Sequence, residues 1–398
     1  MRRVLRSYIL QKEAEIEQVS NIRAHDYPAK TFYFRSNADI DYSRILYSSS
    51  YRRLQGKMQL FVPKSEVFYR NRLTHSHEVS QIAKTIAKKL KLKDSITVQT
   101  CSLAHDIGNP PFGHAGEIFL STCSNVPYEG NAQTLRILRK VEERHHDYNG
   151  LNLTLRTLLG VVKYYKKFEE DNKKFLYDID YEFVKGYIDH YSISHKTIDC
   201  EIMDLSDEIA YAVHDLEDAL KLKYFTIDEL LYEFSIHPEY KDISIEFRRI
   251  IVSAKQFAEK STAYQNSEEY AILFRKELTS QLVSALILDI DLVDDRLGYN
   301  KLRKLCKGLK SLTFKSIKRQ PDIIEYEQLG KHILTKLYEV YNDPDFNENM
   351  VLLPVNYRGK NERARLTLDY IGGMTDLYAI SQYEKYFGKL ADKGIYFK

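Results

Sequence analysis

The scarcity of residues that interrupt helices constrains the fold of this chain more than any other feature. Only 9 prolines and 16 glycines occur among its 398 residues. Long stretches of mixed charged and apolar residues therefore run without either, which is typical of helical proteins. From residue 77 to residue 92, apolar side chains recur every three or four positions, and this spacing predicts an amphipathic helix. The predicted fold class is all-α.

Helical patterns cover most of the remaining sequence. Residues 25–50 are expected to form an irregular arm, and residues 168–198 a connecting region. Strand patterns are weak, with two short candidates at Glu201–Leu205 and Met350–Val355. Further helices are expected at 5–20, 95–106, 114–122, 131–144, 151–167 and 199–222, and as a series from 226 to 398 with a break at Asn342-Asp343-Pro344.

The charge balance limits the kinds of partner that the chain can bind. Its 59 basic and 56 acidic residues give a formal net charge of +3. This balance argues against a surface built as a whole for nucleic acid, but it permits a local basic site for phosphates.

Targeting and cysteine patterns favour a cytoplasmic protein. The basic N-terminus lacks the apolar core of a signal peptide, and no stretch approaches the roughly 20 apolar residues of a membrane span. We therefore expect no membrane association. The cysteines are widely spaced without a Cys-x-x-Cys pair, which favours reduced thiols over a zinc ribbon or disulfides. They are Cys101, Cys123, Cys200 and Cys306.

His105-Asp106 is the first candidate for chemistry. An imidazole and a carboxylate at the end of a helix can bind one metal ion from two sides. Such a pair is weak evidence alone, since His25-Asp26 and His214-Asp215 repeat it. Its context is more specific, because two prolines and three glycines within residues 105–117 favour a tight turn.

The same turn can bring His114 and Glu117 back toward that metal ion. A histidine and a glutamate three residues apart on a helix can act as an oriented acid or base. We therefore predict His114 and Glu117 as catalytic residues.

A second pattern lies within the helix predicted at 199–222. Asp207, Tyr211 and Asp215 are four residues apart and so share one helix face. The competing interpretation is a solvated acidic face, because three other acidic residues lie nearby in the same helix.

Seven stretches in one consistent order resemble the HD superfamily, and most closely its deoxynucleoside triphosphate triphosphohydrolases, the bacterial dGTPases and their relatives. The resemblance implies an HD-domain core at 50–225, preceded by an N-terminal arm at 1–49. It implies a C-terminal helical region at 226–398 that contributes to the nucleotide pocket and to oligomer contacts. The stretches are Tyr-Arg-Arg-Leu-Gln-Gly-Lys-Met-Gln-Leu-Phe (51–61), Arg-Leu-Thr-His-Ser (72–76), the 105–117 run, Glu-Gly-Asn-Ala-Gln (129–133), Lys-Tyr (163–164), Asp-Glu-Ile-Ala-Tyr-Ala-Val-His-Asp-Leu-Glu-Asp (207–218) and Asp-Tyr-Ile-Gly-Gly-Met-Thr-Asp (369–376).

By position, the resemblance implies four ligands for one divalent metal ion, which could be Mn, Mg, Fe, Co or Zn. His77 competes with His75, but two residues apart on a helix the two side chains point about 200° apart. The resemblance favours His75 and leaves His77 as a surface or helix-start histidine. The implied ligands are His75, His105, Asp106 and Asp207.

The resemblance also implies contacts with a triphosphate, which needs several cationic or amide donors. It places Arg72 and Lys163 near the phosphates. Asn109 and Asn131 are candidate amide donors, and Gln133 is a further one. Asn131 and Gln133 are the weaker choices, because an asparagine at a helix start often serves only as an N-cap.

Sugar and base contacts follow from the remaining matches. Arg53 and Gln55 lie in the first stretch, and the glutamine would face the 3′-hydroxyl. Tyr211 would stack on the deoxyribose and Asp215 would accept a hydrogen bond, leaving no room or partner for a 2′-hydroxyl. Two further candidates either close the base pocket or pack and cap a helix. They are Tyr370 and Asp376.

The chain departs from the family pattern at two positions. Glu208 stands where relatives can carry Asp or Lys, so a cationic phosphate contact is missing there. His77 replaces the more usual leucine after Ser76.

The implied reaction is hydrolysis of a deoxynucleoside triphosphate, dGTP first, to a deoxynucleoside and tripolyphosphate by a metal-activated water. The family assembles as homo-oligomers, as tetramers or hexamers, and a nucleotide or single-stranded DNA effector is possible. One alternative is an HD phosphodiesterase or 5′-nucleotidase. Another is a nucleic-acid-binding regulatory protein with a vestigial HD site. In that protein the basic runs 84–93 and 301–318 would bind polyanions. The same runs are also typical of ordinary solvated helix faces.

Overall fold

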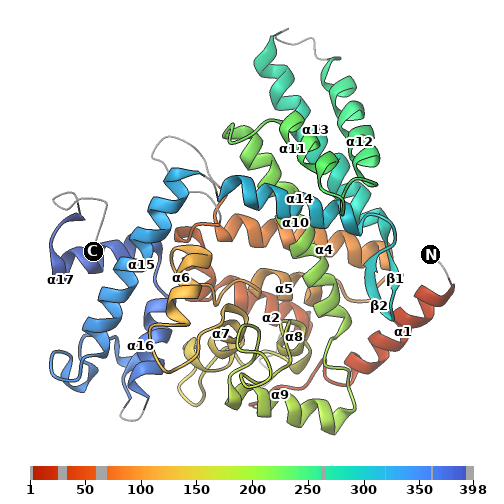
Figure 1. The fold of residues 1–398 in the computed structure, drawn as a ribbon. Coiled ribbons are helices and arrows are strands. Elements are labelled where there is room, and N and C mark those ends of the chain that lie inside the picture. Colours follow the sequence, from red (N-terminus) through yellow and green to blue (C-terminus); the bar gives the residue numbers. More distant parts are fainter. Residues whose placement is uncertain are drawn as a thin grey trace.

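The fold is almost entirely helical, with a single two-stranded sheet in the part of the chain that the structure describes (Figure 1). The all-α prediction is therefore confirmed. Leu60 and Phe61 of the 51–61 stretch lie outside the described residues. The computed structural model describes residues 3–25, 34–59, 70–260, 266–318, 320–359 and 362–390.

The four N-terminal elements are α1 (Arg3–Glu17), α2 (Asn37–Leu46), α3 (Ser49–Arg53) and the 3₁₀ turn η1 (Leu54–Gly56). Two of them, α1 and α2, precede the predicted HD core, and the other two lie at its start. The prediction of an irregular arm at 25–50 is wrong from residue 37 onward. Serines that resemble loop residues act as N-caps here: Ser36 Oγ accepts from Asp39 N at 3.1 Å, and Ser48 Oγ accepts from Tyr51 N at 3.2 Å.

Eight further elements follow within the predicted core, counted over the described residues. The helix expected at 151–167 is formed only at Leu155–Gly160, and residues 168–198 contain a full helix that was not predicted. The strand candidate Glu201–Leu205 is wrong, because it lies inside a helix that Thr197 caps. The elements are α4 (Arg72–Leu90), α5 (Ile96–Ala104), α6 (Gly113–Leu120), α7 (Gly130–Arg136), the π-helical turn η2 (Ile137–Val141), α8 (Leu155–Gly160), α9 (Asp178–Tyr191) and α10 (Ile198–Lys221).

The C-terminal elements include the sheet, an antiparallel hairpin with Asp294 and Asp295 at its tip. Both aspartates have positive φ angles, 49° and 58°, as a two-residue hairpin turn requires. The strand candidate Met350–Val355 is wrong, because it spans turns and 3₁₀ residues. The elements are α11 (Ile227–Ile236), α12 (Ser244–Ala258), α13 (Ser267–Asp289), β1 (Ile290–Val293), β2 (Arg296–Tyr299), α14 (Arg303–Ile317), α15 (Pro321–Asn342), η3 (Glu348–Met350), η4 (Val355–Tyr357), α16 (Arg363–Gly372) and α17 (Asp376–Phe387).

Two large hydrophobic clusters hold these elements together. The larger cluster does not follow the predicted domain boundaries, since Ile9, Ile86 and Leu282 are all buried in it. The second joins α6 to α15, α16 and α17. The division at residues 49/50 and 225/226 stays a prediction.

The centre of the molecule is the contact of α10 with α4, α5 and α14 (Figure 1). The start of α4, the end of α5 and the middle of α10 supply the residues that the sequence predicted as metal ligands. Among the described helices, none is both long and apolar enough to cross a membrane.

Candidate metal centre

The first turn of α4 is fixed by a reciprocal cap. Asn71 Oδ1 accepts from Thr74 N at 3.0 Å, and Thr74 Oγ1 accepts from Asn71 N at 3.0 Å, so the helix starts five residues before the predicted residue 77. His75 is consequently buried inside the protein. His77 lies on the exposed side of the helix, with its Nε2 atom 3.1 Å from Tyr51 Oη.

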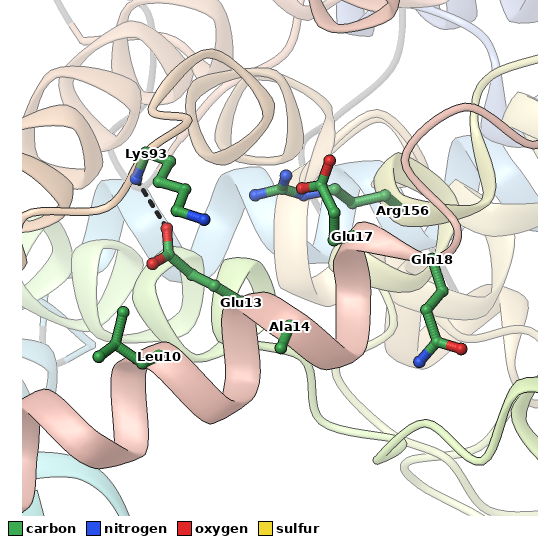
Figure 2. Close-up of a pocket in the computed structure, with 7 residues that line it drawn as sticks. All are labelled: Leu10, Glu13, Ala14, Glu17, Gln18, Lys93 and Arg156. Atoms are coloured by element: carbon green, nitrogen blue, oxygen red, sulfur yellow. Dashed lines mark hydrogen bonds between the residues drawn. The ribbon is translucent and has the colours of Figure 1, made fainter.

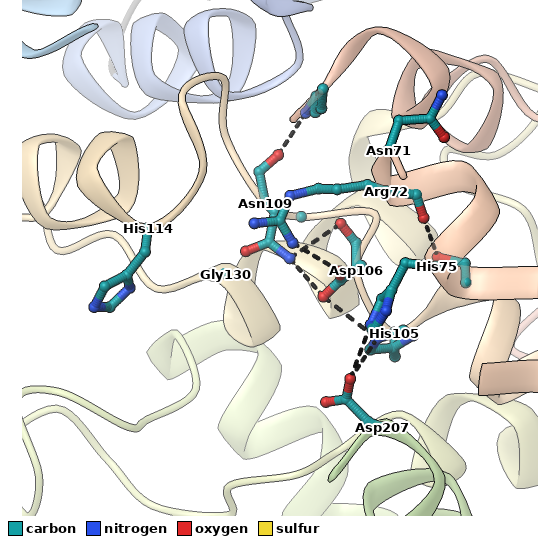
Figure 3. Close-up of polar contacts among 12 residues, drawn as sticks. Asn71, Arg72, His75, His105, Asp106, Asn109, His114, Gly130 and Asp207 are labelled. Carbon is teal, nitrogen blue, oxygen red and sulfur yellow. Dashed lines mark hydrogen bonds and ion pairs between the residues drawn. The ribbon is translucent and has the colours of Figure 1, made fainter. Parts of the chain in front are cut away.

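The four predicted ligands converge in one buried cluster (Figure 3). Asp207 Oδ1 lies 3.1 Å from His75 Nε2 and 3.3 Å from His105 Nε2. Asp106 Oδ1 lies 3.4 Å from the same His105 nitrogen. Helices α4, α5 and α10 therefore bring together two imidazoles and two carboxylates that lie far apart in the sequence.

The tautomer of His105 suits a metal ligand. Its Nδ1–H donates to Ser102 O at 2.6 Å, so Nε2 is the ring nitrogen that can offer a lone pair to an ion. This Nε2 atom is buried and makes no hydrogen bond of good geometry within the described residues. A buried lone pair that faces two carboxylates fits a divalent ion, and the mixed nitrogen and oxygen donors suit Mn, Fe, Co or Zn.

Fixed cations and an amide surround the two carboxylates. Arg72 donates to Asp106 Oδ2 at 2.7 Å, and Lys163 donates to Asp207 Oδ2 at 2.6 Å. Asn109 Nδ2 donates to Asp106 Oδ1 at 2.6 Å. Burial opposes ionisation of both carboxyls, but His105 and Arg72 lower the pKa of Asp106, and Lys163 and His105 lower that of Asp207. Both aspartates are therefore anionic at neutral pH.

The loop that follows His105 is anchored to α7. Thr134 Oγ1 donates to His105 O at 3.1 Å and accepts from Gly108 N at 2.9 Å. A Cβ atom on Gly108 would stand 2.2 Å from Gly130 O, so only glycine fits this contact. The predicted tight turn thus has a packing partner, the start of α7.

His114 and Glu117 form the expected pair on α6. His114 Nδ1 lies 3.4 Å from Glu117 Oε2, and Glu117 Oε1 accepts from Gly130 N at 3.0 Å. Burial opposes ionisation of Glu117, but His114, Lys174 and this backbone bond lower its pKa. Figure 3 shows His114 beyond Asn109 and Gly130, away from the ligand cluster. The side chain of His114 is 61% exposed.

Tyr211 packs beside the cluster, with its ring 4.8 Å from that of His75. Asp215, one turn further along α10, is buried, and burial raises its pKa well above the ordinary value. Lys310 of α14 places its Nζ atom 5.6 Å from the centre of the Tyr211 ring. The sequence analysis did not single out Lys310; the only signal was its place in the basic run 301–318.

Of three other predicted substrate residues, two have protein partners. Arg53 donates to Ser50 Oγ at 3.1 Å, whereas Gln55 in η1 is exposed. Asn131 donates to Glu129 Oε1 at 2.7 Å, and Glu129 is the residue that caps α7.

The further candidate Gln133 is buried. Its Nε2 atom donates to Asp369 Oδ1 at 2.9 Å, and its Oε1 atom accepts from Tyr177 Oη at 3.0 Å. Both ends of the amide are therefore engaged inside the protein.

The two late candidates differ in exposure. Tyr370 Oη lies 3.0 Å from Tyr378 Oη at the surface. Asp376 is buried at the start of α17, where its two oxygens accept from Met58 N and Phe112 N, each at 3.0 Å. Asp376 thus ties the first and third matched stretches to the last.

Lys57 is a buried cation beside this junction, and it donates to Gly372 O at 2.7 Å and to Asn109 O. Burial, with Arg53 and Arg72 nearby, lowers its pKa to about 7. Between pH 7 and about 10.4, Lys57 therefore binds a proton more fully in the unfolded chain than in the folded protein. The free energy of unfolding should consequently rise with pH across this window.

We expect Lys57→Met to remove that rise, since methionine does not titrate. Urea unfolding of both proteins at pH 7, 8 and 9 measures it. A parallel rise in the variant would contradict the assignment to Lys57.

A separate cavity of about 430 Å³ opens beside α1 (Figure 2). Glu13 lies on its wall, where Glu13 Oε1 accepts from Lys93 N at 2.7 Å. None of the lining residues belongs to the candidate site. They are Leu10, Glu13, Ala14, Glu17, Gln18, Lys93 and Arg156.

Comparison with known families gives two matches along the chain. Residues 72–212 match the HD domain, and residues 299–385 match the phosphohydrolase-associated domain. The first match contains all four residues of the buried cluster, and the second contains Lys310.

Curated relatives cover nearly the whole chain. A deoxyguanosinetriphosphate triphosphohydrolase-like protein 2 of Vibrio cholerae is 52% identical over 362 residues, which is 90% of this chain and 90% of the relative. Similarly named proteins of Rickettsia canadensis and Shewanella sediminis are 34% and 32% identical, covering 88% and 90% of this chain and 93% of each relative.

Proposed function

The chain belongs to the HD-domain family of deoxyguanosinetriphosphate triphosphohydrolase-like proteins, and on that premise we propose that it hydrolyses deoxynucleoside triphosphates, dGTP foremost, to a deoxynucleoside and tripolyphosphate. The observation that carries the proposal is the buried cluster of two histidines and two aspartates with Arg72 and Lys163 at its edge. Such a cluster can hold a divalent ion and meet a polyanion at the same place.

His75, His105, Asp106 and Asp207 would hold the ion. When bound there, a divalent ion supplies a polarised phosphate oxygen and a water of lowered pKa. Asn109 and Ser102 keep Asp106 and His105 oriented through the hydrogen bonds already described. These two hydrogen bonds would hold the metal-binding atoms of Asp106 and His105 in place.

Three cations are available to the triphosphate. Arg72 presents a guanidinium fork that suits phosphate oxygens, and Lys163 presents a compact ammonium group. Lys310 of α14 lies over the Tyr211 ring and near Glu208. Glu208 stands at the α10 position where the family pattern can place a cation, so Lys310 would supply from α14 the positive charge that α10 lacks there. All three would stabilise the negative charge that builds on the phosphates during attack.

The sugar would lie along α10. Tyr211 would pack on the deoxyribose, Asp215 would hydrogen-bond near C2′, and Gln55 would face the 3′-hydroxyl. With Tyr211 packed on the sugar, the added hydroxyl of a ribonucleotide would have neither room nor partner, which would select deoxynucleotides.

His114 would protonate the departing 5′-oxygen. Glu117 holds it through Nδ1, so its other nitrogen can face the substrate, and Gly130 fixes Glu117 in turn. His114 and Glu117 would not bind the metal ion; they would transfer a proton.

Incubation with each dNTP and Mn²⁺ or Mg²⁺, with separation of the phosphate products, tests the proposal. We expect tripolyphosphate and free deoxynucleoside in equal amounts, and little turnover of GTP. Pyrophosphate or inorganic phosphate as the first product would indicate the phosphodiesterase or nucleotidase alternative. No product with any dNTP, under conditions where the ion binds, would favour the regulatory alternative.

A further inference from the structure

The cavity of about 430 Å³ beside α1 lies outside the metal centre, and three parts of the fold form its walls (Figure 2). One wall is α1 with the residue that follows it. The connection between α4 and α5 contributes Lys93, and α8 contributes Arg156. Pockets of roughly 300–1,000 Å³ hold small organic molecules, so the size of this cavity suits a small ligand.

Glu13 gives the wall a buried oxygen that lacks a partner. Its Oε1 atom accepts from Lys93 N at 2.7 Å, which fixes the side chain against the connection between α4 and α5. Its Oε2 atom is buried and has no hydrogen-bond partner within the described residues, and Glu13 as a whole is only 7% exposed. A buried acceptor without a donor is unfavourable. A molecule in the cavity can supply the missing donor without disturbing the bond to Lys93.

Arg156 leaves little free positive charge for an anionic ligand. Its guanidinium group donates to both carboxylate oxygens of Asp199, at 2.9 and 3.0 Å, and lies 3.4 Å from Asp94 Oδ2. Two carboxylates thus already face one guanidinium. Lys93, which is exposed, is the remaining cation of the wall.

A second carboxylate of the wall lies one helical turn beyond Glu13. Glu17 is exposed, and four residues along a helix correspond to a rise of about 6 Å. Figure 2 shows the side chains of Glu13 and Glu17 rising from the same side of α1. An alkyl chain of about four or five carbons separates two end groups by roughly 6–7.5 Å, because each carbon–carbon bond is about 1.5 Å long. Two ammonium groups on such a chain can therefore reach both carboxylates.

We propose that this cavity binds a small aliphatic molecule with two ammonium groups. One ammonium group donates to Glu13 Oε2, the other meets the Glu17 carboxylate, and the carbon chain passes along Ala14. Simple diamines and the free amino acid lysine share this chemistry. Free lysine also carries a carboxylate, which can pair with the ammonium group of Lys93.

Calorimetric titration of the full-length protein with cadaverine and with free lysine, at neutral pH and low salt, tests the proposal. Cadaverine has the carbon chain of lysine without the carboxylate. The wild type should bind one equivalent of ligand, and Glu13→Gln or Glu17→Gln should weaken binding about 10-fold or more, because each removes a charge-assisted hydrogen bond. Glutamine at position 13 keeps an oxygen for Lys93 N, and Glu17 is exposed, so both variants should fold.

The same titrations distinguish the two sources of the ligand. Tighter binding of free lysine than of cadaverine, with the difference lost in Lys93→Ala, would identify a basic amino acid. Equal binding of the two would identify a simple diamine.

Glu15→Gln is the matched control, since it removes the same charge from the same helix at a position outside the cavity wall. It should bind the ligand like the wild type, and the net charge of +3 gives the protein no general attraction for dications. The cavity shares no residue with the metal centre, so the result stands whether or not any dNTP is cleaved. No saturable binding of either amine by the wild type, or equal affinity in the wild type and both cavity variants, would overturn the proposal.

Discussion

Replacing Asp207 by Asn is expected to remove the divalent ion from the buried centre and to abolish hydrolysis with it. Asp207 Oδ1 lies 3.1 Å from His75 Nε2 and 3.3 Å from His105 Nε2. Loss of an outer partner of a metal ligand already lowers metal affinity about 10–100-fold, so loss of a ligand should cost at least about 100-fold. Activity at limiting metal concentration should fall by the same factor or more.

Asp204→Asn is the matched control. Asp204 lies one turn earlier on α10 and shares the partner Lys163, at 3.4 Å, but it does not contact the histidines. The same change of charge on the same helix should therefore leave metal content unchanged and activity within a few fold.

Metal content by mass spectrometry, dNTP turnover over a metal titration, and circular dichroism measure the outcome. The dichroism matters because Asp207→Asn leaves the buried Lys163 ammonium without its main counter-charge. A folded Asp207→Asn protein with wild-type metal content and more than a tenth of wild-type activity would show that Asp207 is not a ligand.

The fold could be predicted from the sequence where the decisive interactions are local. The apolar spacing after residue 77 and the long pattern at 199–222 gave α4 and α10, because periodicity within one helix determines which face is buried. The sequence analysis missed α2 and α9. The serine that begins α2 also suits a loop. The choice between cap and loop depends on packing against α5 and residues 151–154.

The candidate site likewise contains some residues that the sequence could indicate and others that it could not. His105 and Asp106 are adjacent, so the sequence could point to them directly. Ser102, three residues before His105, makes a local contact with that histidine. Two contacts that complete the centre come from distant segments: Thr134 of α7 anchors the loop, and Lys310 reaches Tyr211 from α14. Spacing along the chain carries no information about such contacts, because each depends on how two separate helices pack.

His114→Ala is expected to lower kcat about 10²–10⁴-fold while the metal content stays at the wild-type level. His114 is exposed and lies apart from the ligand cluster, so its removal leaves the donors of the ion in place. The expected loss is therefore one of proton transfer to the leaving oxygen, and KM should change little.

Glu117→Gln separates orientation from proton transfer. The glutamine oxygen can still accept from His114 or from Gly130, but the negative charge beside the imidazole is lost. Because orientation is partly kept, kcat should fall less than in His114→Ala. An alanine variant with near wild-type kcat would assign proton transfer to a donor other than His114.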